Sequence, residues 1–181
     1  MANDPWYVMD TGIISRFALS DQFDILRQLY GPQIFTPTDV IAEVTPVIKM
    51  KQQVDQALKD GWMHELTISY REHNAIFHEF IRLRKRFGVG ESATLATARH
   101  MHCVACSDDM RAAVKYCNKH HIPLKGSLGI LYDAYLRGLF DKNKGQTILE
   151  TMIHRSNYKS PVSDFQTIID AFEGRSDWQL F

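Results

Sequence analysis

The sequence has little of what several classes of protein require. Only three cysteines occur, an odd and small number that provides no disulfide framework and makes a reducing cytoplasm the expected location. No hydrophobic run reaches the roughly 20 residues that span a membrane, so no membrane contact is expected. The first residues, MANDPWYVMD, lack a basic segment followed by an apolar stretch, and no secretion signal is therefore predicted.

An excess of positive charge is also missing. Lys and Arg together number 21, Asp and Glu also number 21, and the formal net charge is zero. Because proteins that coat nucleic acid by bulk electrostatics are strongly basic, any nucleic-acid surface of this chain must come from a local basic patch. The 181 residues, of which 45% are hydrophobic, are enough for one compact domain with a hydrophobic core.

Short apolar runs alternate with segments of helical periodicity along the chain. Strands are predicted near residues 6–9, 33–35, 62–68, 103–106 and 122–124. Helices are predicted between them, the longest over residues 70–87, and two more near residues 146–153 and 162–172. This alternation predicts βαβ units and an α/β fold, in which a mainly parallel central sheet is covered by helices on both faces.

Four acidic residues are placed to converge at one edge of this sheet. Asp10 and Asp108 each follow an apolar strand directly, Glu43 lies on the helix after the second strand, and Glu91 follows Gly90 in a first helical turn. Taken singly, each is explained by a turn, a helix cap or the helix dipole. Taken together, they would repel one another unless protonated or neutralised by a cation, and hard oxygen ligands suit Mg²⁺ or Mn²⁺.

The segments that carry these residues resemble the four motifs of the PIN-domain family. VMDTGIISRF is similar to the first motif, TPTDVIAEV to the second, GVGESATLATAR to the third and CSDDMRAAVKYCNKHHIPLKGSLGILYDAYLRGLF to the fourth. The segment Gly126–Leu131 resembles the branch related to the VapC-like toxins of toxin–antitoxin pairs. The resemblance implies a PIN-like three-layer α/β/α domain over residues 1–140, with residues 141–181 as a helical extension packed on it.

The resemblance also implies an activity: metal-dependent hydrolysis of RNA phosphodiester bonds by an endoribonuclease. It assigns the Mg²⁺ or Mn²⁺ to Asp10, Glu91 and Asp108, and gives Glu43 a metal-bound water or a second ion. Auxiliary roles fall to Asp109, where related chains often have Glu, and to Thr11 and Ser127, which are equally well explained as helix caps. A small antitoxin protein and a second copy of the chain are the partners that the toxin branch implies.

Two alternatives to this activity remain open at the level of sequence. One is a non-catalytic PIN module that binds RNA or a protein partner, and the other is a metal-dependent nuclease that acts on DNA. The apolar residues of the early helices, which would either support a homodimer or belong to the core, are Phe17, Leu19 and Phe23.

Two further clusters have both a functional and a structural interpretation. One cluster is a basic run that consists of Arg82, Arg84, Lys85 and Arg86. It is predicted either to contact RNA phosphates or to form a solvated helix face. Arg111 is predicted either to reach a phosphate or to pair with Asp109. A zinc site would use Cys103, Cys106, Cys117, His120 and His121. Strand positions three apart point to opposite faces, however, which favours core cysteines over a zinc site.

Overall fold

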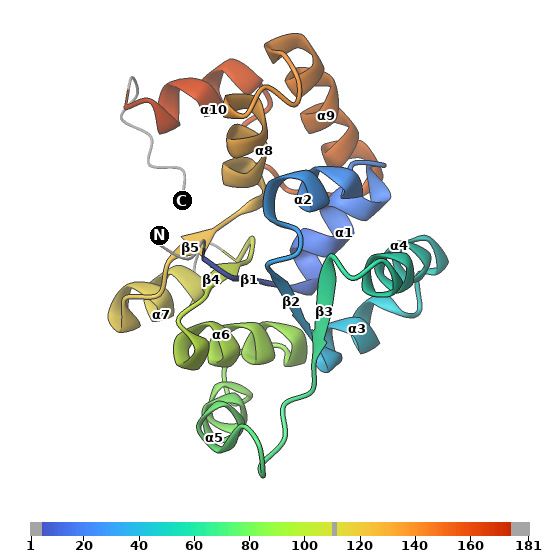
Figure 1. The fold of residues 1–181 in the computed structure, drawn as a ribbon. Coiled ribbons are helices and arrows are strands. Elements are labelled where there is room, and N and C mark those ends of the chain that lie inside the picture. Colours follow the sequence, from blue (N-terminus) through green and yellow to red (C-terminus); the bar gives the residue numbers. More distant parts are fainter. Residues whose placement is uncertain (1–4, 110–111, 175–181) are drawn as a thin grey trace.

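A parallel sheet lies at the centre of the molecule (Figure 1). The structure, a computed structural model, describes residues 5–109 and 112–174. Its five strands are ordered β3-β2-β1-β4-β5, and each neighbouring pair is parallel. They span Tyr7–Met9 (β1), Ile34–Pro37 (β2), Met63–Leu66 (β3), Val104–Cys106 (β4) and Leu124–Lys125 (β5). The predicted parallel sheet is confirmed.

Helices connect the strands and cover both faces of the sheet, so the three-layer α/β/α architecture is also confirmed (Figure 1). None of the helices in the described ranges has the length and apolarity needed to cross a membrane. Their bounds are Thr11–Leu19 (α1), Phe23–Tyr30 (α2), Thr38–Val44 (α3), Ile48–Lys59 (α4), Asn74–Leu83 (α5), Val89–Met101 (α6), Ala112–His120 (α7), Ser127–Leu136 (α8), Lys142–Arg155 (α9) and Phe165–Phe172 (α10).

The core is divided by the sheet into two clusters of buried side chains. Met9 of β1 points into a large cluster with α1 to α4 and α8 to α10, whereas the preceding Val8 points into a smaller cluster with α5, α6 and α7. The same alternation separates Cys106 from Ala105 on β4. Successive side chains of a strand point to opposite faces of the sheet. Because helices cover both faces, β1 and β4 are apolar throughout.

The helix predicted over residues 70–87 is shorter in the structure, where α5 spans only Asn74–Leu83. A turn centred on Ser69 precedes it: the Ser69 hydroxyl accepts a hydrogen bond from the Glu72 N–H at 3.2 Å, and the Ser69 carbonyl accepts one from the His73 N–H at 2.9 Å. Side-chain turns of this kind compete with helix for the same backbone donors, which the apolar periodicity does not reveal.

Helix α9 begins earlier than the predicted residue 146. The Asp141 side chain caps it by accepting a hydrogen bond from the Lys144 N–H at 2.8 Å. Gly145 therefore lies inside the helix rather than at its boundary. The ring of Phe165 occupies the space that a side chain at position 145 would need. A glycine that indicates a helix end in sequence is here a packing residue.

The last two helices pack on the same core as the sheet. Leu149 and Met152 of α9 and Phe165 of α10 are fully buried in the large cluster, together with residues of α1 and α8. A direct contact also joins the C-terminal end of α9 to α1, since the Arg16 guanidinium donates a hydrogen bond to the Ser156 carbonyl at 2.9 Å. The C-terminal helices are therefore integral to the packing of the described chain.

The three cysteines are divided between the two faces of the sheet. Cys106 belongs to the large cluster, whereas Cys103 and Cys117 belong to the small one. Burial raises the pKa of the Cys103 thiol to about 11 and that of Cys117 to about 12. Because the thiols do not converge and are held in their protonated form, their place in the fold is that of core residues.

The early helices do not present the apolar surface considered for a homodimer. Phe17 and Phe23 are buried in the large cluster, and Leu19 packs against it. The three residues therefore belong to the core, which is one of the two interpretations that the sequence left open. Their burial stabilises the fold.

Candidate active site

Two of the predicted acidic residues follow adjacent strands, as expected. Asp10 comes directly after β1 and Asp108 two residues after β4, and the Asp10 N–H donates a hydrogen bond to the Cys106 carbonyl at 3.1 Å. The carboxyl ends of neighbouring parallel strands meet at one edge of a sheet. The topology therefore brings together two carboxylates that are separated by almost a hundred residues in sequence.

Asp10 is held by the start of α1. Its Oδ1 accepts a hydrogen bond from the Ile13 N–H at 2.8 Å, so that it is the N-cap of this helix, and only 7% of the residue is exposed. Burial raises the pKa of Asp10 to about 7, helped by the nearby Asp108, although hydrogen bonds from Ser107 and Ile13 and the charge of Arg16 oppose the shift. The capping interpretation and the functional one therefore apply to the same side chain.

Asp108 is held by the start of α8. The Ser127 N–H donates to its Oδ1 at 2.8 Å, and the Ser127 hydroxyl donates to its Oδ2 at 2.7 Å. On its other side, the Nε of Arg16 lies 3.8 Å from Oδ2. Burial raises the pKa of Asp108, and the hydrogen bonds from Ser127 and the charge of Arg16 oppose this shift. Ser127 thus orients a carboxylate at the edge of the sheet.

Glu91 lies in the first turn of α6 and carries an unsatisfied atom. Its Oε1 is buried and has no hydrogen-bond partner among the described residues. Burial raises the pKa of Glu91 to about 7, and the charges of Asp109 and Asp10 add to the effect. A buried carboxylate oxygen without a donor is unfavourable by about 1–3 kcal/mol, so this atom needs a proton or a cation.

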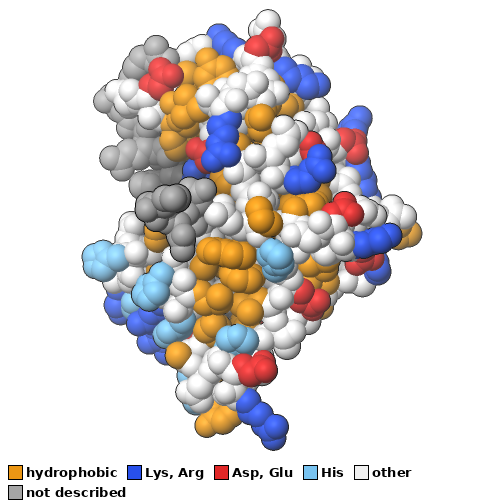
Figure 2. Space-filling model, viewed as in Figure 1, with side chains coloured by type: hydrophobic (Ala, Val, Ile, Leu, Met, Phe, Trp, Pro, Cys, Tyr) orange, Lys and Arg blue, Asp and Glu red, His pale blue; other side chains and the backbone are white. Residues whose placement is uncertain are grey.

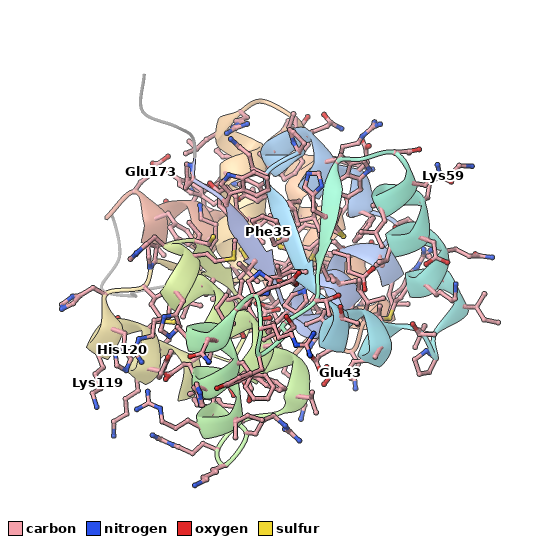
Figure 3. All side chains as sticks on the ribbon, turned by 60° about the horizontal axis from the view of Figure 1, so that its bottom comes forward. Phe35, Glu43, Lys59, Lys119, His120 and Glu173 are labelled. Atoms are coloured by element: carbon pink, nitrogen blue, oxygen red, sulfur yellow. The ribbon has the colours of Figure 1, made fainter. Side chains whose placement is uncertain are left out.

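Glu43, in the last turn of α3, accepts hydrogen bonds from residues of the first and the third motif. Its Oε1 accepts a hydrogen bond from the Gly90 N–H at 2.9 Å, and its Oε2 accepts one from the Thr11 hydroxyl. Figure 3 shows Glu43 between α3 and α6, at the edge of the sheet. A Cβ at position 90 would lie 2.6 Å from Glu43 Oε2, so only glycine permits this approach.

These side chains line one pocket of about 360 Å³. All four predicted acidic residues reach it, together with Thr11 and the auxiliary Asp109, whose own N–H donates to the Ser107 hydroxyl at 3.2 Å. Ser127 is fully buried behind Asp108 and is not part of the lining. The pocket is lined by Asp10, Thr11, Gly12, Arg16, Glu43, Gly88, Glu91, Asp108 and Asp109.

The chemistry of this lining suits a hard divalent cation. Within residues 5–109 and 112–174, no three His, Cys, Asp or Glu side chains already form a metal-binding cluster. Asp10, Asp108 and Glu43 are each held by hydrogen-bond donors, and carboxylates that repel one another are not expected to cluster without a cation. Mg²⁺ keeps several waters and needs only one or two direct carboxylates, so a preformed cluster of three is not required.

Arg16 and Gly90 contribute to the site and were not predicted as site residues from the sequence. Arg16 stands six positions after Asp10 on α1, and it reaches the pocket because its guanidinium is held by Ser156 and by the ring of Tyr158, 5.3 Å away. Gly90 directly precedes Glu91 in the third motif, and its N–H donates a hydrogen bond to Glu43. A glycine directly before a predicted site acid is the sequence signal that would have indicated a close approach of another side chain at this position.

The predicted basic run does not reach the acidic pocket. Arg82 pairs with Glu79, Arg84 donates to the Phe87 carbonyl at 3.0 Å, and the exposed Arg86 lies over the Phe87 ring. Lys85 is exposed to solvent. Arg111 lies outside the residues that the structure describes. The run is therefore separated from the acidic pocket by the short turn that ends at Gly88.

Comparison with known proteins agrees with the fold and with the order of the motifs. A family model described as a PIN domain matches residues 6–172, which include every acidic residue of the pocket and extend through α10. No curated protein and no solved structure gives a significant match. Since the matched region covers nearly the whole sequence, this chain belongs to the PIN-domain family.

Proposed function

We propose that this chain is an endoribonuclease that hydrolyses RNA phosphodiester bonds with the help of Mg²⁺ or Mn²⁺. PIN domains are generally nucleases, and such nucleases generally use divalent metals. The observation that carries the proposal is the convergence of carboxylates on one pocket, above all Glu91, whose buried Oε1 lacks a donor among the described residues. Structural caps alone would not require an unsatisfied acid there.

The proposed metal ligands are Asp10, Glu91 and Asp108. A bound divalent cation lowers the pKa of a coordinated water and stabilises the charge that develops on the scissile phosphate. Asp10 and Asp108 are oriented for this role by the helix starts that hold them, through Ile13 and Ser127. Because these donors fix the carboxylates before any ligand arrives, little reorganisation accompanies binding.

Glu43 has the proposed role of orienting the attacking water. Its two oxygens accept hydrogen bonds from Gly90 and Thr11, which leaves their remaining lone pairs directed at the pocket that Glu43 helps to line. Thr11 then acts by positioning Glu43, and Ser127 by positioning Asp108. The proposed auxiliary role of Asp109 is electrostatic, since its charge contributes to the raised pKa of Glu91.

RNA as the substrate, and the partners of the chain, are proposed on the resemblance of Gly126–Leu131 to the toxin branch. A small antitoxin and a second copy of the chain are the partners considered on the same ground. The cytoplasm is the compartment in which RNA and reduced thiols occur together, and the protonated buried cysteines are compatible with it.

A substrate panel tests the proposal. Purified protein is incubated with labelled single-stranded RNA, hairpin RNA, single-stranded DNA and duplex DNA, in Mg²⁺, Mn²⁺, Ca²⁺ or EDTA. We expect RNA cleavage in Mg²⁺ or Mn²⁺ and none in EDTA, with losses of at least about a hundredfold in Asp10→Asn and Glu91→Gln. Asp55→Asn removes an exposed carboxylate of α4 and serves as the matched control, which should retain full activity.

Each other outcome selects a different function. Cleavage of DNA alone would replace RNA as the substrate while keeping the metal site. RNA binding without cleavage under any metal condition would make the chain a non-catalytic module. Cleavage that is equal in wild type and Asp10→Asn would mean that the acidic pocket is not where the reaction takes place.

A further inference from the structure

A second pocket, of about 270 Å³, lies between the end of α5 and α7, and it is strongly basic. Figure 2 shows Lys, Arg and His side chains gathered over this part of the molecule, and Figure 3 shows Lys119 and His120 projecting from α7. Of the described residues, no Asp or Glu contributes to the lining. The residues used below are Arg82, Arg86, Lys115, Tyr116, Lys119 and His120.

The lysines of this pocket lie close to one another without acidic partners in the described part of the chain. Some lysines elsewhere on the surface are neutralised by acids: Lys49 pairs with Asp21, and Lys51 pairs with Asp55. Within the described ranges, neither Lys115 nor Lys119 forms an ion pair, and both are exposed. In a chain of zero net charge, a group of unmatched cations produces a local positive potential that favours an anionic ligand.

Glu79 lies beneath the pocket and already accepts several hydrogen bonds. The buried Glu79 accepts hydrogen bonds from Arg82, Arg99 and the Tyr116 hydroxyl, and these donors hold the pKa of its carboxyl at about 2 despite the burial that opposes the shift. Two guanidinium groups surround a single carboxylate, so positive charge remains. The network also fixes Arg82 in place, so the cation is oriented before a ligand binds.

The basic pocket and the acidic pocket lie on either side of one short turn. Arg86 lines the basic pocket and Gly88 lines the acidic one. Consecutive Cα atoms are about 3.8 Å apart, which keeps the Cα atoms of these two residues within about 7.6 Å of each other. The turn is held by the hydrogen bond from Arg84 to the Phe87 carbonyl. The two pockets are therefore close to each other at this turn.

We propose that the basic pocket binds backbone phosphates of the RNA strand next to the scissile phosphate, which extends the proposed nuclease function to a defined substrate path. Arg82 and Arg86 provide planar guanidinium groups that match phosphate geometry, and Lys115 and Lys119 provide mobile point charges. The ring of His120 rests on Tyr116, with centroids 4.6 Å apart, and forms an aromatic wall beside these cations. Phosphate contacts of this kind position a strand without reading its sequence.

RNA binding without cleavage tests the proposal. Asp10→Asn protein in EDTA is titrated into labelled single-stranded RNA over a range of salt concentrations, and binding is followed by fluorescence anisotropy. In this background, Lys115→Gln with Lys119→Gln should lower affinity at least about tenfold at low salt. The slope of log K against log salt should fall by about 1.4, or about 0.7 for each phosphate that is no longer neutralised.

The matched control removes the same charge elsewhere. Lys59→Gln with Lys142→Gln changes exposed lysines of α4 and α9, which line neither pocket, and should leave affinity and salt slope unchanged. Lys115→Arg with Lys119→Arg should bind as tightly as the parent, since the positive charge is retained. Unchanged melting temperatures establish that every variant is folded.

The outcomes separate this proposal from the nuclease function. Loss of binding in the pocket variant but not in the control supports the phosphate site, whether or not the wild type cleaves RNA. Equal affinities of the pocket variant (Lys115→Gln with Lys119→Gln) and the control (Lys59→Gln with Lys142→Gln), or no RNA binding by the parent, would overturn the phosphate site. RNA cleavage by the wild type together with equal affinities would leave the nuclease function standing and remove only the basic pocket from the substrate path.

Discussion

Asp10 and Glu91 have raised pKa values for the same physical reason: each carboxylate is buried, and each lies near another acid. Such groups favour the folded state when protonated and oppose it when charged. The candidate site therefore stores electrostatic strain that a cation would relieve. At the residue scale, this makes pH and single substitutions the most direct probes of the acidic pocket.

Asp10→Asn should stabilise the metal-free protein at neutral pH. The pKa of Asp10 is about 7 in the folded chain and near 3.8 as a free side chain. Its contribution to stability is therefore complete below about pH 4 and is lost as the pH rises through about 7. Asn is neutral and caps a helix equally well, so the variant should gain on the order of 2 kcal/mol at neutral pH and nothing at about pH 4.

Urea unfolding in EDTA at a series of pH values measures this difference. Other acids titrate in the same range, but they are shared by both proteins and cancel in the comparison. A difference in stability that does not change with pH would show that Asp10 has the same pKa in the folded and the unfolded chain, contrary to the raised pKa.

Gly90→Ala should impair cleavage far more than stability. The new methyl group would meet Glu43 Oε2 and, 2.9 Å away, the Thr11 hydroxyl, and so would displace the proposed water-orienting acid. The displaced atoms are at the end of a flexible side chain, and Ala is favoured over Gly in a helix, so stability should change by less than about 1 kcal/mol. We expect at least about a tenfold loss of activity.

A double-mutant cycle with Glu43→Ala assigns this loss. If the methyl group acts by displacing Glu43, Gly90→Ala should have little further effect once that side chain is removed. Additive losses in the double variant would instead mean that Gly90 acts on catalysis independently of Glu43.

At the scale of elements, α9 shows how packing overrides a local signal. Glycine is unfavourable in a helix by roughly 1 kcal/mol, yet Gly145 lies in the first turn of α9, and the ring of Phe165 from α10 fills the space beside it. The helix start is set instead by the Asp141 cap. The division into a domain of residues 1–140 and a helical extension of residues 141–181 stays a prediction, and residues 175–181 lie outside those that the structure describes.

Gly145→Ala should destabilise the protein although it improves helix propensity. A Cβ at this position would lie 2.6 Å from the Phe165 ring, which is fully buried and cannot move aside freely. We expect a net loss of about 1–3 kcal/mol in urea unfolding. Gly129→Ala is the matched control, because its Cβ would approach only the flexible Lys125 chain, 3.3 Å away, and the Phe172 ring, 3.4 Å away. Equal stabilities of the two variants would contradict this account of α9.

At the scale of the whole molecule, Arg16 connects the C-terminal helices to the acidic pocket. Its guanidinium donates to the Ser156 carbonyl at the end of α9, and its Nε lies 3.8 Å from Asp108. The side chain is largely covered, which strengthens its interaction with the acid relative to an exposed pair. The extension thus contributes to the electrostatics of a site formed by the sheet.

Arg16→Gln should lower stability and raise the pKa of Asp108 further. The variant leaves a buried carboxylate without its cation, a loss of about 2–4 kcal/mol at neutral pH that should shrink as acid protonates Asp108. Urea unfolding at neutral and at acid pH measures both effects. Arg137→Gln removes an arginine that donates to the Leu29 carbonyl but faces no acid, so its loss should be the same at both pH values.

Much of the fold and part of the site were determined by the sequence itself. Apolar runs of strand length, separated by helical periodicity, predicted the parallel sheet, and the rule that its carboxyl ends share one edge brought Asp10 and Asp108 together. These features depend on local patterns and on the handed connection of strands, so they can be read along the chain. The four motifs likewise indicated the family that the comparison confirmed.

Only the tertiary structure decided which side chains meet across distant segments. The hydrogen bond from Gly90 to Glu43, the approach of Arg16 to Ser156, and the basic pocket between α5 and α7 all depend on distances between elements. Side-chain contacts of this kind arise from how the layers pack, and packing is a property of the whole core rather than of any local pattern. The sequence therefore determined where the acids would gather, and packing determined what surrounds them.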